Sequence, residues 1–305
     1  MTTRRGGFAL LAALWVTVTL SAMALAGLLV ARGVTNGSRN RIALMRGQWR
    51  AEDCLERARA VINDALSGGR AIPRPVPGGW EALDRVVAAS PAITDAACDV
   101  RLIPTGLAVD LNVVDREQLL AVLRVLGVGE PRADSMADAV LDWRDADDIP
   151  RPMGAERDWY LSRGQFTPRN GPFADVRELR RVRGFEDLPD SLLNAVFTVE
   201  PGRIVLARAS LAVIASLPGI GEEALARIAE RRARGVAVTD LNALAADLSP
   251  AARALLVSRY SDLTRLTTDQ PDAWVLTARG GGYAVEVRLA SAGARAAIVR
   301  RRTTP

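Results

Sequence analysis

Acidic side chains gather in one short stretch of this sequence. Asp145, Asp147 and Asp148 lie within four residues, and Glu156 follows Gly154 by two. Carboxylates at alternate positions of an irregular loop suit calcium, which accepts about six to eight oxygen ligands in a flexible geometry. The spacing departs from an EF-hand loop, because Ile149 stands where the third donor belongs. The pattern indicates a candidate calcium site that is not an EF-hand.

Two metal-free interpretations use the same residues. The acids alternate with Arg144, Arg151 and Arg157, so the loop could be a solvated segment neutralised by ion pairs. A pair such as Asp145 and Glu156 could also serve as acid and base in glycoside hydrolysis. That reaction needs a platform for the sugar, and we expect the aromatic residues nearby to pack at the roots of the loop instead. They are Trp143, Trp159 and Tyr160.

Composition excludes most other active sites. The 305 residues include two cysteines, no histidine and no lysine, so all 40 basic residues are arginine. Without histidine there is no Ser-His-Asp relay and no imidazole-ligated metal. Without lysine there is no P-loop lysine and no Schiff base. Two cysteines are too few for a thiolate-ligated zinc site.

Positive charge is confined to the N-terminal end. Residues 1–51 hold seven arginines and no acid, whereas the remainder holds 33 arginines against 35 acids. The basic end flanks Phe8–Ala31, a run of 24 residues without a charge. A helix of that length crosses a hydrocarbon core of about 30 Å. Because the excess positive charge of +5 is confined to the residues that flank this apolar run, it indicates a membrane anchor rather than a nucleic-acid surface.

The rest of the chain begins and ends with elements of a mixed fold. Apolar spacing predicts that the helix continues through residues 32–66 and ends at Gly68-Gly69, before a Pro/Gly loop at 70–79. Residues 97–110 are typical of a β-hairpin with its turn at 104–106. Three C-terminal segments predict further strands, namely 273–279, 283–289 and 296–301. A long helix with strands on both sides of a helical insertion predicts an α+β fold.

The insertion contains an internal repeat. Leu119–Gly129 matches Leu211–Gly221, and residues 173–179 match residues 238–244. Each copy has a helix, a glycine-hydrophobic-glycine turn and a second helix, which is the helix-hairpin-helix pattern. The first copy carries about 27 extra residues between its two matches, roughly 142–170, and these hold the acidic stretch.

Such hairpins often bind the DNA backbone, but the charges here disfavour it. Glu222 and Glu223 follow the second turn, and Glu130 follows the first. Acids at these positions suit the helix dipole and repel a phosphate docked on the same amides. We therefore expect packing modules and no binding to nucleic acid.

The first residues resemble the leader of type IV prepilins and pseudopilins. Arg4-Arg5-Gly6-Gly7-Phe8 is a short basic segment that ends in glycine immediately before the apolar helix. The resemblance implies that a prepilin peptidase cuts between Gly7 and Phe8 and methylates Phe8. Pilins usually carry glutamate at the fifth mature residue, where this chain has Ala12. Among pseudopilins that absence is characteristic of the K subunit. An ordinary signal anchor remains open on these residues alone.

Four further segments resemble, in order, the K minor pseudopilin family of type II secretion: LNVVDREQLL, DWRDADD, GAERDWY and PRNGPFADVRELRRVRG. The resemblance implies a pilin-like α+β fold, in which a transmembrane helix packs on an antiparallel sheet, with an inserted α-domain of two helix-hairpin-helix (SAM-like) repeats. It also implies calcium in the insertion, held by Asp145, Asp147, Asp148 and Glu156, with Asp142 and Asn170 as weaker candidates. The expected boundaries are 1–7 for the leader, 8–31 for the membrane helix, 32–110 for the pilin-like part, 111–266 for the insertion (111–199 and 200–266) and 267–305 for the last strands.

The same resemblance implies a function. The chain would be a non-enzymatic, single-pass inner-membrane protein with its bulk in the periplasm. It would cap the tip of a short pseudopilus beside the I and J minor pseudopilins and help to initiate assembly. The alternative is a membrane-anchored helix-hairpin-helix DNA receptor of the competence type.

The two cysteines form a possible pair. Cys54 lies late in the long helix and Cys98 lies at the first strand, two elements that pack together in pilin folds. The oxidising periplasm would favour a disulfide between them. Two separate buried thiols are the competing interpretation.

Overall fold

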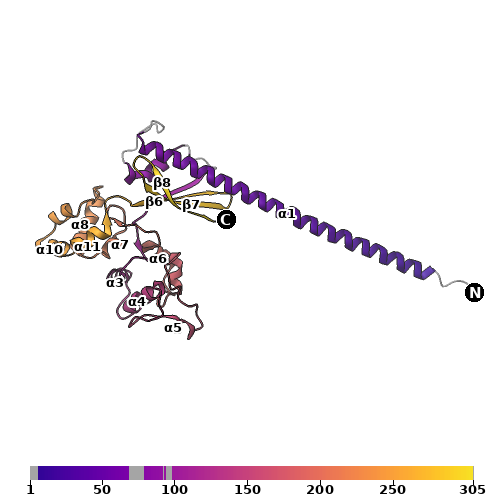
Figure 1. Ribbon diagram of the computed structural model, residues 1–305, viewed down its shortest axis with the longest axis horizontal. Helices are drawn as coiled ribbons and strands as arrows, with labels where there is room; N and C mark the ends of the chain where they lie inside the picture. The colour runs from indigo at the N-terminus through magenta and orange to yellow at the C-terminus, as the bar shows by residue number, and fades with distance from the viewer. Residues whose placement is uncertain (1–5, 69–78, 92, 94–97, 305) are drawn as a thin grey trace, which may run out of the picture.

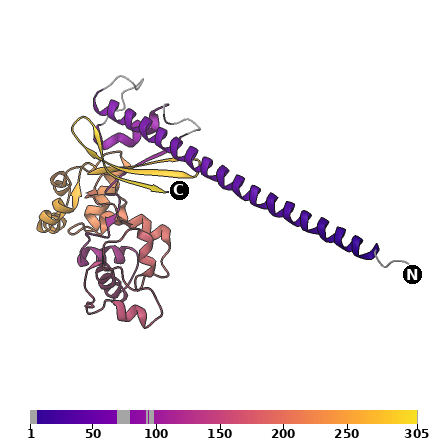
Figure 2. The same ribbon diagram turned by 45° about the vertical axis from the view of Figure 1, so that its right-hand side comes forward.

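A computed structural model describes residues 6–68, 79–91, 93 and 98–304. It consists of one long helix, a sheet packed on the C-terminal third of that helix, and a helical domain inserted between two strands of the sheet (Figures 1 and 2). The inserted domain lies at the end of the molecule opposite the N-terminus. The first five residues of the leader and the 70–78 part of the Pro/Gly loop fall outside the described residues.

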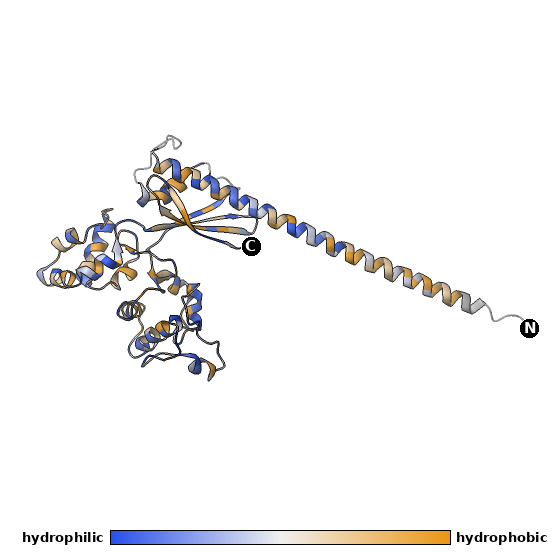
Figure 3. Ribbon diagram, viewed as in Figure 1, coloured by the Kyte–Doolittle hydropathy of each residue, from blue (hydrophilic) through white to orange (hydrophobic). Residues whose placement is uncertain are grey.

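The long helix α1 runs without a break over Gly6–Leu66. It ends where the sequence predicts, because Gly68 has a φ of +74° that favours glycine and stops the helix. Figure 3 shows that apolar residues dominate the N-terminal stretch and that polar residues increase toward the head. Among the described residues this is the one helix long and apolar enough to cross a membrane, and its most apolar window is wholly exposed.

The pilin-like core forms between α1 and a four-stranded antiparallel sheet. The sheet has the order β1 (Asp99–Pro104), β6 (Ala273–Gly280), β7 (Tyr283–Ser291) and β8 (Ala296–Thr304), which confirms the three predicted C-terminal strands. Alternate residues of β7, Val285, Val287 and Leu289, are buried against α1, and Leu55 of α1 is fully buried opposite them. Burying each such side chain contributes roughly 2 kcal/mol. A short 3-10 helix, η1 (Trp80–Ala82), and α2 (Leu83–Ala89) cover the remaining edge of this core.

The predicted hairpin at 97–110 is wrong. β1 pairs with β6 across the insertion, with Pro104 opposite Trp274, and the next backbone amide, of Thr105, donates to Ala273 O at 2.9 Å. The segment after the turn, β2 (Val109–Asp110), pairs in parallel with β3 (Phe197–Thr198) inside the helical domain. Two strand-like runs beside a glycine turn look like a hairpin locally. β1 pairs instead with β6 of the C-terminal sheet, where six of its residues find partners, and this longer pairing is favoured over the local hairpin.

This pairing moves the boundaries of the insertion outward from the expected 111 and 266. The chain leaves the sheet after Pro104 and returns at Ala273. Gly106 makes the exit possible, since its φ is +81° and a Cβ there would lie 2.0 Å from Arg203 O. The Val205 amide donates to Gly106 O at 2.9 Å, which joins the exit to the middle of the inserted domain.

The inserted domain has two halves of similar plan. Each half is closed by a parallel pair of two-residue strands, β2 with β3 in the first and β4 (Ile204–Val205) with β5 (Thr267–Thr268) in the second. The first half holds α3 (Arg116–Val125), α4 (Arg132–Arg144), α5 (Arg157–Leu161), the 3-10 helix η2 (Val176–Arg181) and α6 (Asp190–Val196). The second holds α7 (Leu211–Ala215), α8 (Glu222–Ala233), α9 (Leu241–Ala246), α10 (Pro250–Ser258) and α11 (Tyr260–Leu266).

The two halves share their turn and cap geometry at matching positions. Gly127 and Gly219 have nearly equal φ angles of +80° and +79°. Asp175 caps η2 by accepting from the Arg177 amide, and Asp240 caps α9 by accepting from the Asn242 amide. The halves are unequal elsewhere, because α3 has ten residues and α7 has five.

Ion pairs join the inserted domain to the pilin-like core. Glu200, in the connection between the halves, contacts Arg288 of β7 at 3.4 Å and Arg300 of β8. Arg208 contacts Asp84 of α2 at 2.8 Å. These contacts hold the second half beside the sheet and leave the first half, with its acidic loop, projecting away from it (Figure 1).

Candidate metal centre

The last turn of α4 holds the first carboxylate of the site. Asp142 is fully buried there, and the neighbouring Trp143 stacks on Phe173 with ring centroids 6.4 Å apart. The Arg144 guanidinium donates to the carbonyls of Leu111 and Val114, at 2.6 Å for Val114, which ties the helix end to the start of the domain. These contacts set the position of Asp142 before the loop begins.

The loop after α4 folds back onto the helix through backbone amides. Asp142 accepts from the Ala155 amide at 2.8 Å and from the Arg151 amide at 3.3 Å. One turn earlier, the buried Asp138 accepts from the Met153 amide at 3.2 Å. Hydrogen bonds from backbone amides to buried carboxylates are charge-assisted, so they hold a segment that has no regular structure of its own.

Three carboxylates converge where the loop meets the helix. Oxygens of Asp142, Asp145 and Glu156 all lie within 4.8 Å of one another. Glu156 is 4% exposed, and neither of its carboxylate oxygens has a hydrogen-bond partner. Burial, followed by the charges of Asp142 and Asp145, raises the pKa of Glu156 to about 7. A buried carboxylate without partners is costly, so this group requires either a proton or a cation.

Arg151 neutralises only part of this charge. Its guanidinium contacts Asp142 at 2.6 Å and Asp145 at 2.5 Å. Burial raises the pKa of Asp142, and the hydrogen bond from Arg151 opposes that shift. Three ionised carboxylates and one guanidinium leave a net charge of −2, and Glu156 has no share in the ion pairs. The solvated-loop interpretation explains Arg151 with Asp142 and Asp145, but it does not explain Glu156.

The cluster differs from the expected set in two members. Asp145 and Glu156 are in it, and so is Asp142, which the resemblance implies only as a weaker candidate, whereas Asp147 and Asp148 are not. Asp147 is exposed and accepts from the Ile149 amide at 2.9 Å, while the exposed Asp148 accepts from the Asn170 side chain at 2.9 Å. Asp142 and Asp145 are three residues apart across the end of a helix, a spacing that places side chains on one face and favours Asp142 over Asp147 and Asp148.

Asn170 is bonded to the loop that follows Asp145 and carries a further oxygen without a partner. Its side-chain nitrogen donates to the Asp147 carbonyl at 3.1 Å and to Asp148, which leaves its Oδ1 buried without a partner. Its φ of +48° lies in the left-handed region, which asparagine tolerates better than most residues. Four buried oxygens in this region have no donor, namely Oδ1 of Asp145, Oε1 and Oε2 of Glu156, and Oδ1 of Asn170.

This donor set fits a hard divalent cation. The unpartnered atoms of Asp145, Glu156 and Asn170 are all acceptor oxygens, and no thiolate or imidazole belongs to the cluster. Carboxylate and amide oxygens on an irregular loop match calcium, while magnesium prefers a tighter octahedron. A cation among these oxygens would satisfy the buried acceptors and offset the excess negative charge.

The aromatic residues near the loop pack against one another and into the core of the domain. Tyr160 is fully buried, and its ring meets the ring of Trp143 edge to face with centroids 5.6 Å apart. Trp159 meets Tyr160 at 4.9 Å, and Arg163 lies over its ring. These rings form the floor of the loop, as the sequence predicts.

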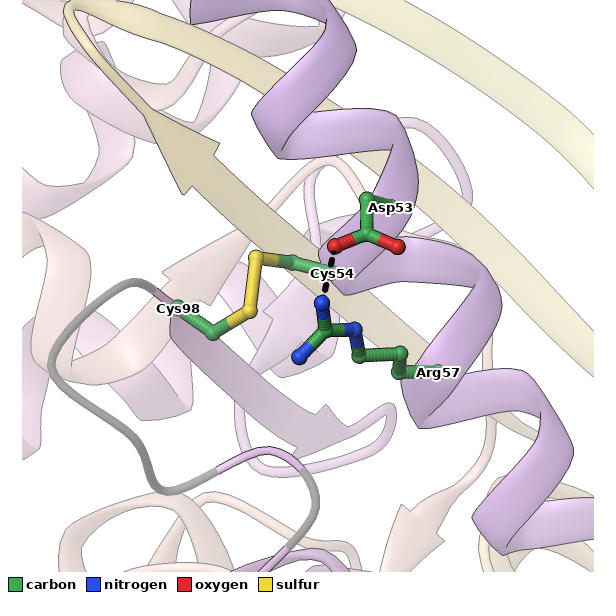
Figure 4. The surroundings of a disulfide bond; sticks show 4 residues. All are labelled: Asp53, Cys54, Arg57 and Cys98. Carbon is green, nitrogen blue, oxygen red and sulfur yellow. Dashed lines mark ion pairs between the residues drawn. A yellow bond between two sulfur atoms is a disulfide. The ribbon is translucent and has the colours of Figure 1, made fainter.

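The two cysteines form a disulfide in the structure. Figure 4 shows the bond between Cys54 on α1 and Cys98, immediately before β1, with the ion pair of Asp53 and Arg57 beside it. The Cα atoms are 5.5 Å apart, inside the range that a disulfide requires. The other expected site, the leader junction of Gly7 and Phe8, lies in the first turn of α1.

The hairpin turns present carboxylates where a DNA phosphate would dock. Glu223, in the first turn of α8, accepts from the Ser249 amide at 2.7 Å and from the Ser249 hydroxyl at 2.6 Å. These hydrogen bonds lower the pKa of Glu223 and keep it ionised. In the first half, Glu130 occupies the position that matches the neighbouring Glu222.

Comparisons with known proteins agree on one family. The family model described as "Type II secretion system (T2SS), protein K" matches residues 106–197. The type II secretion system protein K of Dickeya chrysanthemi is 42% identical over 62 residues, which are 20% of this chain and 17% of that protein.

The fold is similar to that of a chain in the crystal structure of the GspK-GspI-GspJ complex from enterotoxigenic Escherichia coli. The TM-score is 0.63 at 17% identity, and the match covers 88% of this chain and 99% of that one. At this identity the likeness concerns the fold, which includes the pilin-like sheet and the inserted helical domain. Within this chain, residues 106–197 therefore resemble the type II secretion system protein K family, and the fold as a whole resembles that of the solved chain.

Proposed function

We propose that this chain is a non-enzymatic minor pseudopilin that occupies the tip of a type II secretion pseudopilus and helps to initiate its assembly. The observation that carries the proposal is the division of α1 into two parts. Its N-terminal part is apolar and exposed, while its C-terminal part is buried against the sheet from Gly47 onward. A protein of this form is anchored in the inner membrane by the apolar part of α1, and its bulk lies in the periplasm. It leaves the membrane when the helices of other subunits pack against that anchor.

The tip position follows from the N-terminal residues and from the width of the head. Ala12 stands where pilins usually carry a glutamate. Without that carboxylate in its membrane span, the subunit has no charge with which to align on a further subunit beyond it, which suits a position at the tip. The inserted domain adds bulk at the end of the molecule farthest from the N-terminus (Figure 2). A head of this width fits the end of a fibre better than its shaft.

The partners we propose are the I and J minor pseudopilins and the prepilin peptidase. The solved structure of similar fold is of a complex that contains GspI and GspJ. Packing of apolar helices in the membrane and matching of the heads above it would select these partners.

We also propose that calcium binds at the end of α4. Asp142, Asp145 and Glu156 would hold it, with Asn170 as a further oxygen donor. When bound, calcium supplies positive charge and no redox chemistry. Residues of the chain position the ligands: Asp142 accepts hydrogen bonds from the loop amides, and the Arg151 guanidinium contacts the carboxylates of Asp142 and Asp145.

Co-isolation and complementation test the proposed function. Removing this chain from its host should abolish export by the type II system, and full-length chain should restore it. The chain should co-purify with I and J subunits from detergent-solubilised membranes. Normal export without the chain would contradict the proposal.

A competence-type DNA receptor is the alternative function. It predicts binding of the detergent-solubilised chain to duplex DNA that weakens steeply with salt. The acids at both hairpin turns predict no such binding.

A further inference from the structure

A row of arginines runs along α1 between the membrane span and the head: Arg32, Arg39, Arg46 and Arg50. Successive residues of an α-helix are rotated by about 100°, so these four fall within about 40° of one another around the axis. All four are exposed, and residues 1–51 contain no acid. The described ion pairs of α1 lie farther along the helix, at Glu52, Asp53 and Glu56. The row therefore has no partner among the described carboxylates of its own chain.

An apolar strip lies beside this row. Val34, Ile42, Met45 and Trp49 are between 49% and 72% exposed. By the same rotation they fall within about 80° of one another, and the strip lies about 150° from the face that packs on the sheet. The head of the molecule therefore leaves the strip uncovered. Large apolar side chains gathered on one exposed face mark an interaction surface.

Lipid does not explain the upper part of this surface. The uncharged run ends at Ala31, and Trp49 lies 18 residues beyond it, which is about 27 Å along the helix axis. The headgroup layer adds only about 5–8 Å on each side of the hydrocarbon core. Met45, Arg46 and Trp49 therefore lie above the lipid headgroups, and a covering partner at this height must be a protein.

A second copy of the same chain is also a poor occupant. Two copies anchored at the same depth would place the same arginine rows at the same height, with no acid in residues 1–51 of either chain. Like charges that face each other destabilise the contact. The charge pattern favours a different chain.

We propose that this face of α1 is the docking surface for the N-terminal helix of a different subunit, one that carries carboxylates about 12 to 28 Å above its own membrane span. The apolar strip supplies the packing, and Arg39, Arg46 and Arg50 select the acidic partner. The inference rests on the proposed function and specifies how the partner is recognised. It also excludes a second copy from this position.

Photo-crosslinking locates the occupant. A photoreactive phenylalanine analogue at Met45 lies on the strip, while the same analogue at Asn40 lies at similar height on the opposite, exposed side of α1. Full-length chain is expressed with the I and J subunits in its native membrane. We expect a crosslink from Met45 to one of those subunits, with a yield several-fold above that from Asn40. A crosslink between two copies of this chain, or equal yields from both positions, would overturn the proposal.

Charge reversal tests the arginine row. The triple variant R39E/R46E/R50E should lose about tenfold or more in co-purification with the crosslinked subunit, because the reversal replaces three attractive contacts with three repulsive ones. Changing the facing carboxylates of that subunit to arginine should restore the yield. The control R101E/R124E/R265E makes the same change of charge on exposed arginines of the head and should leave the yield unchanged.

The outcomes separate this inference from the proposed function. Failure of the wild-type chain to co-purify with any pseudopilin subunit contradicts the function itself. Wild-type yield from the R39E/R46E/R50E variant contradicts only the docking surface. A loss that appears in nanodiscs of anionic lipid and is absent in neutral lipid would assign the arginines to lipid headgroups and overturn the proposal.

Discussion

Gly154 lies against the carboxylate of Asp142 so closely that a Cβ on the glycine would stand 1.9 Å from Oδ2. The contact brings the returning loop within reach of α4, so that the Ala155 amide donates to the same oxygen and Glu156 turns toward Asp145. The candidate metal site therefore depends on a residue that has no ligand atom of its own.

Gly154→Ala should destabilise the loop because the added methyl group overlaps a buried carboxylate. We expect a loss of about 1–3 kcal/mol in the free energy of unfolding, the usual cost of overpacking. Thermal denaturation of the full-length protein in detergent measures it. Gly171→Ala is the matched control, since the nearest heavy atom to its Cβ would be 3.9 Å away. Equal melting curves for the two variants would contradict the close approach.

Calcium should raise the melting temperature of the protein, and EDTA should lower it. A metal that binds only the folded form adds about 2.7 kcal/mol at 100 times its Kd. Magnesium should do less, because it demands a tighter octahedron. Asp145→Ala and Glu156→Ala should each abolish the calcium effect, whereas Asp147→Ala should retain most of it, since Asp147 lies outside the carboxylate cluster. A calcium response in both of the first two variants would show that the site is elsewhere.

The metal-free protein should lose stability as the pH rises from about 4.5 to about 7. The pKa of Glu156 is raised from 4.5 to about 7 by burial, so the folded state binds a proton that the unfolded state releases in this window. The stabilisation is present below pH 4.5 and is lost as the pH passes 7, a change on the order of 3 kcal/mol.

Glu156→Gln should remove this contribution, so the difference between the two proteins should itself vary with pH. Calcium needs the ionised carboxylate, and its effect on the melting temperature should therefore be larger at pH 8 than at pH 6. Melting curves in EDTA and in calcium at both pH values test the linkage. A pH dependence identical in wild type and Glu156→Gln would contradict it.

Loss of the disulfide should destabilise the pilin-like core. The bond closes a loop of 44 residues between α1 and β1, and removing such a constraint costs about 4 kcal/mol in the chain-entropy model. Cys54→Ser/Cys98→Ser should melt at a lower temperature than the wild type, and a reducing agent should affect only the wild type. Free thiols in native protein labelled under denaturing conditions would contradict the bond.

Elements with a strong period could be predicted from the sequence. The uncharged run, the apolar spacing of residues 32–66 and the glycines after it predict α1 to its last turn, and the alternation from Tyr283 to Leu289 predicts β7. Each of these signals is carried by the residue pattern within a single helix or strand, so it can be recognised without knowing what that element packs against. The acidic stretch likewise indicates the position of the candidate site.

Features that depend on distant partners could not be predicted. β1 pairs with β6, some 170 residues farther along the chain, because the C-terminal sheet offers a longer edge than a local hairpin does. Spacing marks Asp142 as a candidate beside Asp145, but no local pattern encodes the return of the loop, through the amides of Arg151 and Ala155, that brings Glu156 to them. In both cases a tertiary contact overrides the local pattern.

The N-terminus of the mature protein tests the central claim most directly. A pseudopilin is processed at its leader, and the junction before the apolar helix is Gly7-Phe8. Intact-mass analysis and N-terminal sequencing of the chain purified from its native membrane should give a protein that starts at an N-methylated Phe8. The same chain in a host without prepilin peptidase should keep its leader. A mature protein that starts at Met1, or one cut beyond Ala31, would contradict the account.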